Sequence, residues 1–312
     1  MRLTRNSLTA AAALLLLPAL ALASDDISAT KLGGTLTVVG GGFSDAIYMT
    51  SPAPGVVVLI GRDGTTINGL PAVGFGAINS VQMGLGGGGD VIRFAGLRLA
   101  GDLTIDLGPG SDVITDFAAL RVGGTFRIVT GEAGGSDRIA LADTFVGTDF
   151  FISTDEGPVN VELTGVQVRG NLVVDAGTAD DSVTLREATA GTINIQTGVG
   201  NDAVTLSGVR VNALETNTGE GTDSLRIELT DAFGMIDLNT AGGDDVAALT
   251  DITATGDFRA QFADGMDTVS GTRVQAAGIA SFDGGTDVDT LTDTEIVGDV
   301  ETQIVNFEVI LP

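Results

Sequence analysis

Residues 202–217 read DAVTLSGVRVNALETN, and the next six residues, 218–223, read TGEGTD. Apolar and polar residues alternate in three short runs, which are separated by Ser207-Gly208 and Asn212-Ala213. Alternation with a period of two, interrupted by Gly, Ser and Asn, is typical of short β-strands joined by turns. The stretch therefore predicts three short strands in a unit that begins and ends at an aspartate.

This unit recurs along most of the chain. An aspartate follows a glycine-rich turn at steps that are mostly 21 or 22 residues, and these aspartates are Asp90, Asp112, Asp137, Asp181, Asp202, Asp223, Asp245, Asp267 and Asp289. The one long step, from Asp137 to Asp181, contains a degenerate copy near Asn160. Self-similarity at a period of roughly 20 to 50 residues indicates stacked units that contact only their neighbours.

Positions within the unit form columns of like residues. Apolar residues stand two places after each aspartate: Ile92, Ile114, Ile139, Val183, Val204, Leu225, Ala247, Val269 and Leu291. Seven places before it stand Met83, Ile105, Val174, Ile195, Thr216, Leu238, Ala260 and Phe282. We expect an all-β fold, a parallel β-helix (β-solenoid) of about ten turns of about 22 residues with three short strands per turn. The turns would stack roughly 4.8 Å apart, in a right-handed sense.

A glycine column marks a second corner, and Asn212 replaces glycine in one turn. Because Asn tolerates left-handed backbone angles better than most residues, we expect backbone geometry to explain this column. Its glycines are Gly101, Gly123, Gly147, Gly170, Gly191, Gly234, Gly256, Gly278 and Gly298.

The ends of the chain predict three segments. Residues 1–23 combine Arg2 and Arg5 with an apolar run that ends in small residues, which is typical of a secretory signal peptide. Residues 24–79 have a less regular strand pattern, with a degenerate copy of the glycine turn before Asp45. We expect them to form an N-terminal β cap with degenerate first turns. Residues 80–312 form the repeat domain. We expect an exported protein, secreted or held at the cell surface.

Composition excludes several classes of function. The formal net charge is −26, which disfavours nucleic acid and anionic lipid as partners and attracts cations. The chain has no Cys, so the fold is stable without disulfides, and no His, so histidine catalysis and histidine metal ligation are excluded. No long apolar stretch follows the predicted signal peptide, and we expect no membrane insertion.

The turns Gly108-Pro-Gly-Ser-Asp112, Gly198-Val-Gly-Asn-Asp202 and Gly219-Glu-Gly-Thr-Asp223 share the form G-x-G-x-D. This form resembles the RTX, or hemolysin-type, calcium-binding repeat of secreted bacterial proteins, although the family's first glycine is replaced and the period is longer here. The resemblance implies Ca²⁺ between stacked turns. The candidate calcium ligands are Asp90, Asp112, Asp202, Asp223, Asp245, Asp267 and Asp289. A second polar column, Asp106, Asp175, Gln196, Asn217, Asn239, Gln261 and Asp283, could supply further ligands.

Two structural alternatives stay open. Aspartate after a glycine turn can accept hydrogen bonds from neighbouring backbone amides and so order the corner without any metal. Arg98, Arg121, Arg210 and Arg273 share one phase, either as a stripe that binds polyanions or as outward residues that neutralise nearby acids.

For function, we expect a non-enzymatic structural or adhesive protein of the cell surface or extracellular matrix, with calcium ions and a surface polysaccharide or protein as partners. Carboxylates are spread over every unit, and no single cluster or nucleophile motif stands out. The alternative is a carbohydrate-active β-helix enzyme or a polysaccharide-binding module, which would need a distinct polar cluster in a cleft.

Overall fold

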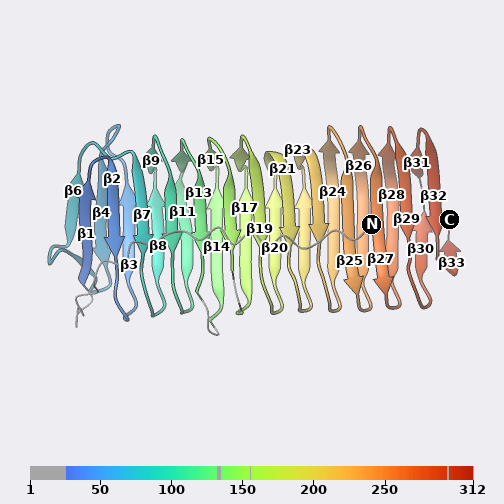
Figure 1. Ribbon diagram of the computed structural model, residues 1–312, viewed down its shortest axis with the longest axis horizontal. Coiled ribbons are helices and arrows are strands. Elements are labelled where there is room, and N and C mark those ends of the chain that lie inside the picture. The colour runs from blue at the N-terminus through green and yellow to red at the C-terminus, as the bar shows by residue number, and fades with distance from the viewer. Residues whose placement is uncertain (1–25, 132–134, 155, 294, 312) are drawn as a thin grey trace.

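The computed structural model describes residues 26–311 except 132–134, 155 and 294. The predicted signal peptide, residues 1–23, lies outside the described residues. The described chain is a β-solenoid of about ten stacked turns, as the repeat predicted (Figure 1). Successive turns pair in parallel: for example, Val183 of one turn pairs with Val204 of the next. No helix among the described residues is long and apolar enough to cross a membrane.

Three faces run along the solenoid, one for each strand of the predicted unit. The first face follows the repeat aspartate and consists of β3 (Ala46–Thr50), β8 (Val91–Ala95), β11 (Val113–Ala118), β14 (Asp137–Ala142), β17 (Val159–Thr164), β20 (Ser182–Arg186), β22 (Ala203–Ser207), β24 (Ser224–Ala232), β26 (Val246–Ala254), β28 (Thr268–Ala276), β30 (Thr290–Asp293) and β33 (Val309–Leu311).

The second face is narrow. It consists of β9 (Arg98–Leu99), β12 (Arg121–Val122), β15 (Phe145–Val146), β18 (Gln167–Val168) and β31 (Ile296–Gly298). Between β18 and β31 it is formed by the ends of longer, bent strands, because Gln167 pairs with Thr189 and Arg210 pairs with Asp231.

The third face precedes the glycine-rich turn. Its strands are β2 (Thr35–Val39), β7 (Ser80–Gly84), β10 (Leu103–Asp106), β13 (Phe126–Val129), β16 (Phe150–Ser153), β19 (Asn171–Asp175), β21 (Thr189–Gln196), β23 (Arg210–Asn217), β25 (Ile236–Gly242), β27 (Phe258–Asp264), β29 (Ile279–Asp283) and β32 (Glu301–Val305).

The N-terminal end differs from the rest of the stack. Strand β1 (Asp26–Leu32) pairs antiparallel with β2, and β4 (Val57–Arg62) pairs antiparallel with β3 and with β6 (Ala72–Phe75). The short β5 (Thr66–Ile67) completes this end by pairing with β1. These strands lie on the edges of β2 and β3 that do not face β7 and β8, so they cover the open end of the first turn.

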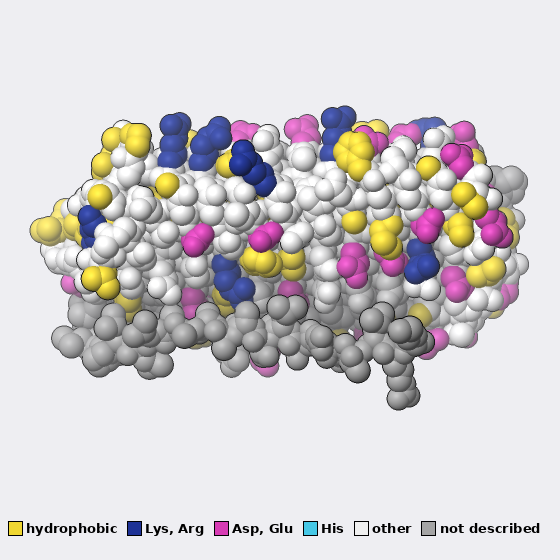
Figure 2. All heavy atoms as spheres, turned by 45° about the horizontal axis from the view of Figure 1, so that its top comes forward, with side chains coloured by type: hydrophobic (Ala, Val, Ile, Leu, Met, Phe, Trp, Pro, Cys, Tyr) yellow, Lys and Arg dark blue, Asp and Glu magenta, His cyan; other side chains and the backbone are white. Residues whose placement is uncertain are grey.

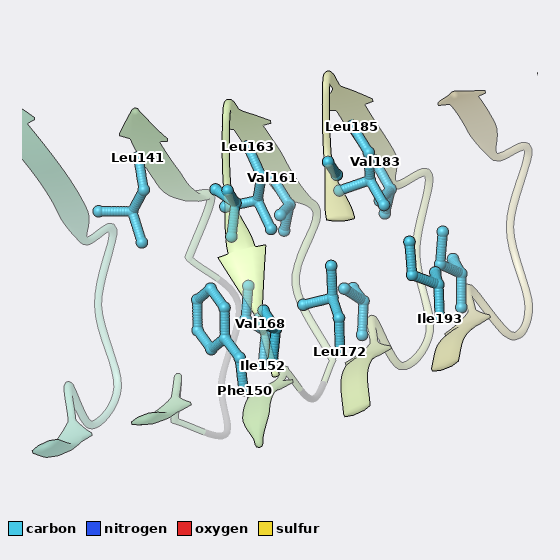
Figure 3. Close-up of a cluster of buried hydrophobic side chains, with 14 of the residues drawn as sticks. Leu141, Phe150, Ile152, Val161, Leu163, Val168, Leu172, Val183, Leu185 and Ile193 are labelled. Carbon is cyan, nitrogen blue, oxygen red and sulfur yellow. The ribbon is translucent and has the colours of Figure 1, made fainter. Parts of the chain in front are cut away.

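Both apolar columns point into the rod. Every residue of the two columns predicted from the sequence is at most 1% exposed. The core is therefore a continuous set of inward ladders, in which like side chains meet from turn to turn (Figure 3). Phe126 and Phe150, for example, stack with ring centroids 4.5 Å apart. One turn alone cannot bury such a ladder, so the stacking of neighbours stabilises the fold.

The reason predicted for the second glycine column is wrong. Its glycines do not adopt left-handed angles. A Cβ added at Gly147 would lie 2.1 Å from the carbonyl oxygen of Gly123, and one at Gly234 would lie 2.5 Å from that of Asn212. Glycine is therefore favoured in most turns of this corner because the preceding turn leaves little room for a side chain, whereas Asn212 is accommodated in one turn.

Candidate functional site: the aspartate ladder

The repeat aspartates form a hydrogen-bonded ladder along the inside of one corner. The backbone amide of Asp202 donates to Asp223 Oδ1 of the next turn at 2.8 Å, and the amide of Asp223 donates to Asp245 Oδ1 at 2.8 Å. The same bond joins Asp45 to Asp90, Asp90 to Asp112, Asp112 to Asp137, Asp181 to Asp202, Asp245 to Asp267 and Asp267 to Asp289, at 2.6 to 2.8 Å. The structural alternative for these aspartates, acceptance of neighbouring amides, is thus confirmed.

The ladder supplies an acceptor that the backbone lacks at this corner. The carbonyl of Asp202 accepts the amide of Ser224, as in a regular parallel pair. The amide of Asp202 itself is buried and donates to the carboxyl of Asp223, not to a backbone carbonyl. A buried amide without an acceptor costs about 1–3 kcal/mol, so each carboxyl removes a penalty in the turn before it.

Two residues modify the ladder where an aspartate is missing. In the degenerate turn the ladder position is Val159, whose amide donates to Asp181 Oδ1 at 2.8 Å. Valine offers no acceptor, and the amide of Asp137 bonds to the carbonyl of Pro158 at 3.0 Å. At the C-terminal end, Glu308 Oε2 accepts the amide of Asp289 at 2.8 Å.

The ladder carboxyls are buried, and in most of them only one of the two oxygens accepts a hydrogen bond. Their exposed fractions run from 0 to 8%. The second oxygen, Oδ2, accepts no hydrogen bond in Asp90, Asp112, Asp181, Asp202, Asp223, Asp245, Asp267 and Asp289. The hydroxyl of Thr197 lies near Asp202 and lowers its pKa, but it donates to the carbonyl of Thr218 at 2.9 Å. A line of buried oxygens without donors disfavours the ionised carboxylate.

Burial raises the pKa values accordingly. Loss of solvation raises the pKa of Asp90, Asp181 and Asp267 to about 7, and that of Asp112 and Asp245 to about 6. The donated amide of the preceding turn opposes this rise, and the carboxyls of adjacent turns add to it. Near neutral pH the ladder therefore holds protons that an exposed aspartate would have lost.

A second ladder lies one residue earlier and was missed from the sequence. Asp180 Oδ1 accepts the amide of Asn201 at 2.7 Å, and Asn201 Oδ1 accepts the amide of Thr222 at 2.9 Å. Asp244 Oδ1 accepts the amide of Met266 at 2.9 Å. These exposed acceptors serve the following turn, whereas the buried aspartates serve the preceding one. The recurring Asp, Asn or Ser before the repeat aspartate was the available signal.

The glycine turns leave few oxygens for a cation. The carbonyl of Gly198 accepts the amide of Glu220 at 3.0 Å, and the carbonyl of Glu220 accepts the amide of Gly200 at 2.9 Å. A Cβ at Gly219 would lie 1.7 Å from the carbonyl oxygen of Gly198, so adjacent turns are in contact here. These carbonyls are thus used for hydrogen bonds between turns.

The seven predicted calcium ligands share one buried column, but they do not converge on a point with other acids. Among the described residues, no group of three or more acidic side chains is arranged to hold a metal. The second polar column lies on the third face at positions that alternate with the buried residues, so it points outward. Burial raises the pKa of the ladder aspartate Asp289, and the charge of Asp283, a member of this column, adds to that rise. This donor set fits six- to eight-coordinate calcium poorly, and calcium binding stays a prediction.

The predicted shared phase holds for Arg98, Arg121 and Arg210 but is wrong for Arg273, because Gln275 continues their column and Arg273 lies at the corner before the second face. The four arginines divide into two groups. Arg210 forms an ion pair with Asp231 at 3.6 Å, and Arg273 pairs with Asp251 through two nitrogens. These two neutralise nearby acids. Arg98 and Arg121 make no ion pair with any acidic residue in the described chain. An open groove of about 780 Å³ runs along the C-terminal half of this corner and is lined by Arg210, Asp231, Asp251, Arg273 and Gln275 among others.

Comparison of the chain with protein-family models, with curated proteins and with solved structures gives no match.

Proposed function

We propose that the chain is an exported, non-enzymatic rod with a structural or adhesive role at the cell surface or in the extracellular matrix. The observation that supports this most is the repetition of one bond from Asp45 to Glu308. Every turn except the degenerate one at Val159 uses its carboxyl for the same backbone amide, so the repeated acids hold turns together. A catalytic role would instead set one turn apart with a local cluster of polar groups.

The proposal is tested by localisation and by loss of a whole unit. The full chain, expressed in a bacterial host, should reach the medium or the cell surface, where protease added to intact cells degrades it. Deletion of residues 202–222 removes one complete turn and should leave a folded, shorter rod with its adhesion to surfaces retained. Retention in the cytoplasm, or release of reducing sugar ends from a polysaccharide by the purified protein, would contradict the proposal.

The groove favours a second candidate, a polysaccharide-binding module. It is open and lined by guanidinium, carboxylate, amide and hydroxyl groups from several successive turns. Such groups hydrogen-bond sugar hydroxyls without any catalytic pair. The substitution Thr253→Trp would fill the groove with an indole. Loss of binding to neutral glycans immobilised on an array, with adhesion of the rod unchanged, would favour this candidate.

A further inference from the structure

We propose that Arg98, Arg121 and Arg169, the last two in contact with Phe145, form a binding stripe for an acidic polysaccharide whose carboxylate or sulfate groups recur along its chain. This inference is independent of the scaffold role. It rests on the pairing register of the second face, on the ion pairs that these arginines lack in the described chain, and on the contacts of Arg121 and Arg169 with the ring of Phe145.

The register places like charges next to each other. Arg121 pairs directly with Arg98 on one side and with Phe145 on the other. In a parallel ladder these neighbours are one turn, roughly 4.8 Å, apart. Like charges in this arrangement destabilise a sheet. The chain has 41 acidic and 15 basic residues, so an acidic residue would be the more common neighbour and would stabilise the pair.

Farther along the same column, an arginine does have an acidic neighbour. Arg210 pairs in register with Asp231 and forms an ion pair with it. Four of the five ion pairs in the described chain involve arginines from Arg210 onward, and the fifth is Arg138 with Glu162. The N-terminal part of the column is therefore distinct, with cations left available. Lys and Arg side chains gather along the upper edge of this half of the rod (Figure 2).

Nearby acids are engaged elsewhere. Asp102 Oδ1 accepts the amide of Thr125, and Asp149 Oδ1 accepts the amide of Asn171, both at 2.8 Å. Asp116 Oδ1 accepts the amide of Ala142, also at 2.8 Å. Asp143 is exposed two residues before Phe145 and forms no ion pair with these arginines in the described chain. Asp102, Asp116 and Asp149 are each held by a backbone amide, and none of them forms an ion pair with Arg98, Arg121 or Arg169 in the described chain.

Phe145 restricts the guanidinium groups on both sides. The centre of the Arg169 guanidinium lies 5.4 Å from the ring centroid, and that of Arg121 lies 6.0 Å from it. Cation–π contacts of this kind limit side-chain freedom before a ligand arrives. A guanidinium also presents two parallel donors, which match the oxygens of a carboxylate or sulfate.

The dimensions of the stripe favour a glycan among anionic partners. Arg98, Arg121 and Phe145 form a single column, and Arg169 lies two residues beyond Gln167, which continues it. Such a stripe is small, whereas a stable protein interface buries about 800 Å² on each partner. Its one aromatic ring already contacts two guanidinium groups, whereas proteins that bind single-stranded nucleic acid stack successive bases on several aromatic rings. The net charge of the rod does not forbid binding, because acids more than about 8 Å away are largely screened at physiological ionic strength.

Binding of fluorescein-labelled oligosaccharides to the full chain tests the stripe by fluorescence anisotropy. The probes are an alginate (carboxylated), a heparin (sulfated) and a dextran (neutral). We expect binding of an acidic probe that weakens as NaCl rises, and no binding of dextran. The triple variant Arg98→Gln/Arg121→Gln/Arg169→Gln should bind at least tenfold more weakly. The matched variant Arg226→Gln/Arg259→Gln, which removes two exposed cations that are already paired with Glu228 and Asp237 and lie outside the groove, should bind within about twofold of the parent.

Three outcomes would overturn the proposal. The first is that neither acidic probe binds at low salt, and the second is that the triple and the matched variants lose equal affinity. The third is that the triple variant abolishes self-association in sedimentation velocity and leaves glycan binding intact, since the stripe would then contact a second copy of the chain. The three arginines are exposed, so the triple variant should keep the parent's circular dichroism and thermal midpoint.

Discussion

The backbone amide of Asp181 donates a 2.7 Å hydrogen bond to Asp202 Oδ1 in the next turn of the solenoid. This bond gives the repeated aspartate a defined structural role. It also leaves Asp202 Oδ2 buried without a hydrogen-bond donor. The ladder therefore satisfies backbone amides and accumulates buried acid at the same time, and the following predictions separate these two effects.

Removal of one ladder carboxyl should weaken the stack. In Asp202→Ala, the amide of Asp181 loses its acceptor, and we expect a loss of about 1–3 kcal/mol in the free energy of unfolding. Asp202→Asn keeps an acceptor oxygen at that place and should retain most of the stability. Urea unfolding followed by circular dichroism measures both. Asp299→Ala, at an exposed position, is the control and should change little. Equal losses in Ala and Asn variants would contradict the amide-acceptor role.

The solenoid should be more stable in mild acid than at alkaline pH. The pKa of Asp90, Asp181 and Asp267 is about 7 in the folded chain, against an ordinary value of 3.8. The folded state thus binds more protons than the unfolded chain, and the stabilisation, complete below pH 3.8, is lost as pH rises through about 6 to 7. We expect the thermal midpoint to fall between about pH 5 and pH 8.

The charge at one ladder position can be removed while a side-chain oxygen is kept as the acceptor of the backbone amide. Asp181→Asn does not titrate, so this variant should show a smaller fall of the midpoint over the same pH range. The exposed Asp251, whose pKa is lowered by its bond to Arg273, acts in the opposite direction, with an effect confined to pH below its ordinary value. A midpoint that rises steadily from pH 5 to 8 would show that the ladder is ionised in the folded state.

Glycine at the turns should be required where adjacent turns touch. Gly219 has φ of 95°, and a Cβ there would lie 1.7 Å from the carbonyl oxygen of Gly198. Gly219→Ala should cost more than the roughly 1–2 kcal/mol of a left-handed angle alone, because the clash adds to it. Gly84 has an ordinary angle and open space around its Cα, so Gly84→Ala should be neutral. Denaturant midpoints of the two variants would make the comparison, and similar values would contradict it.

The calcium hypothesis predicts a midpoint that rises with calcium concentration. A ligand that binds only the folded state at one hundred times its Kd adds about 2.7 kcal/mol per site. Thermal unfolding in EDTA, in millimolar CaCl₂ and in MgCl₂ at matched ionic strength separates specific binding from charge screening. No shift specific to calcium would leave amide acceptance as the role of Asp112, Asp202 and Asp223.

The residues of each strand that face the core could be predicted from the sequence, because every turn must bury apolar side chains of its own. Val204 must face the core, and its alternation with Ala203 and Thr205 records that requirement within a single turn. Repetition at a step of 21 or 22 residues then places Val183 and Leu225 above and below it. For this reason the three strands, the inward columns and the stacking could all be predicted.

Other features depend on how neighbouring backbones approach, which a repeat period does not specify. The same aspartate column could face solvent or the interior, since a shift of one residue reverses the facing of a strand. Only the folded chain shows that the buried carboxyl of Asp202 accepts the amide of Asp181. It also shows that Gly147 lies close to the carbonyl oxygen of Gly123, and that Arg98 pairs in register with Arg121. The sequence by itself determined which residues lie in one column. The contacts between turns decided what each column does, because burial and hydrogen bonding arise only when two turns meet.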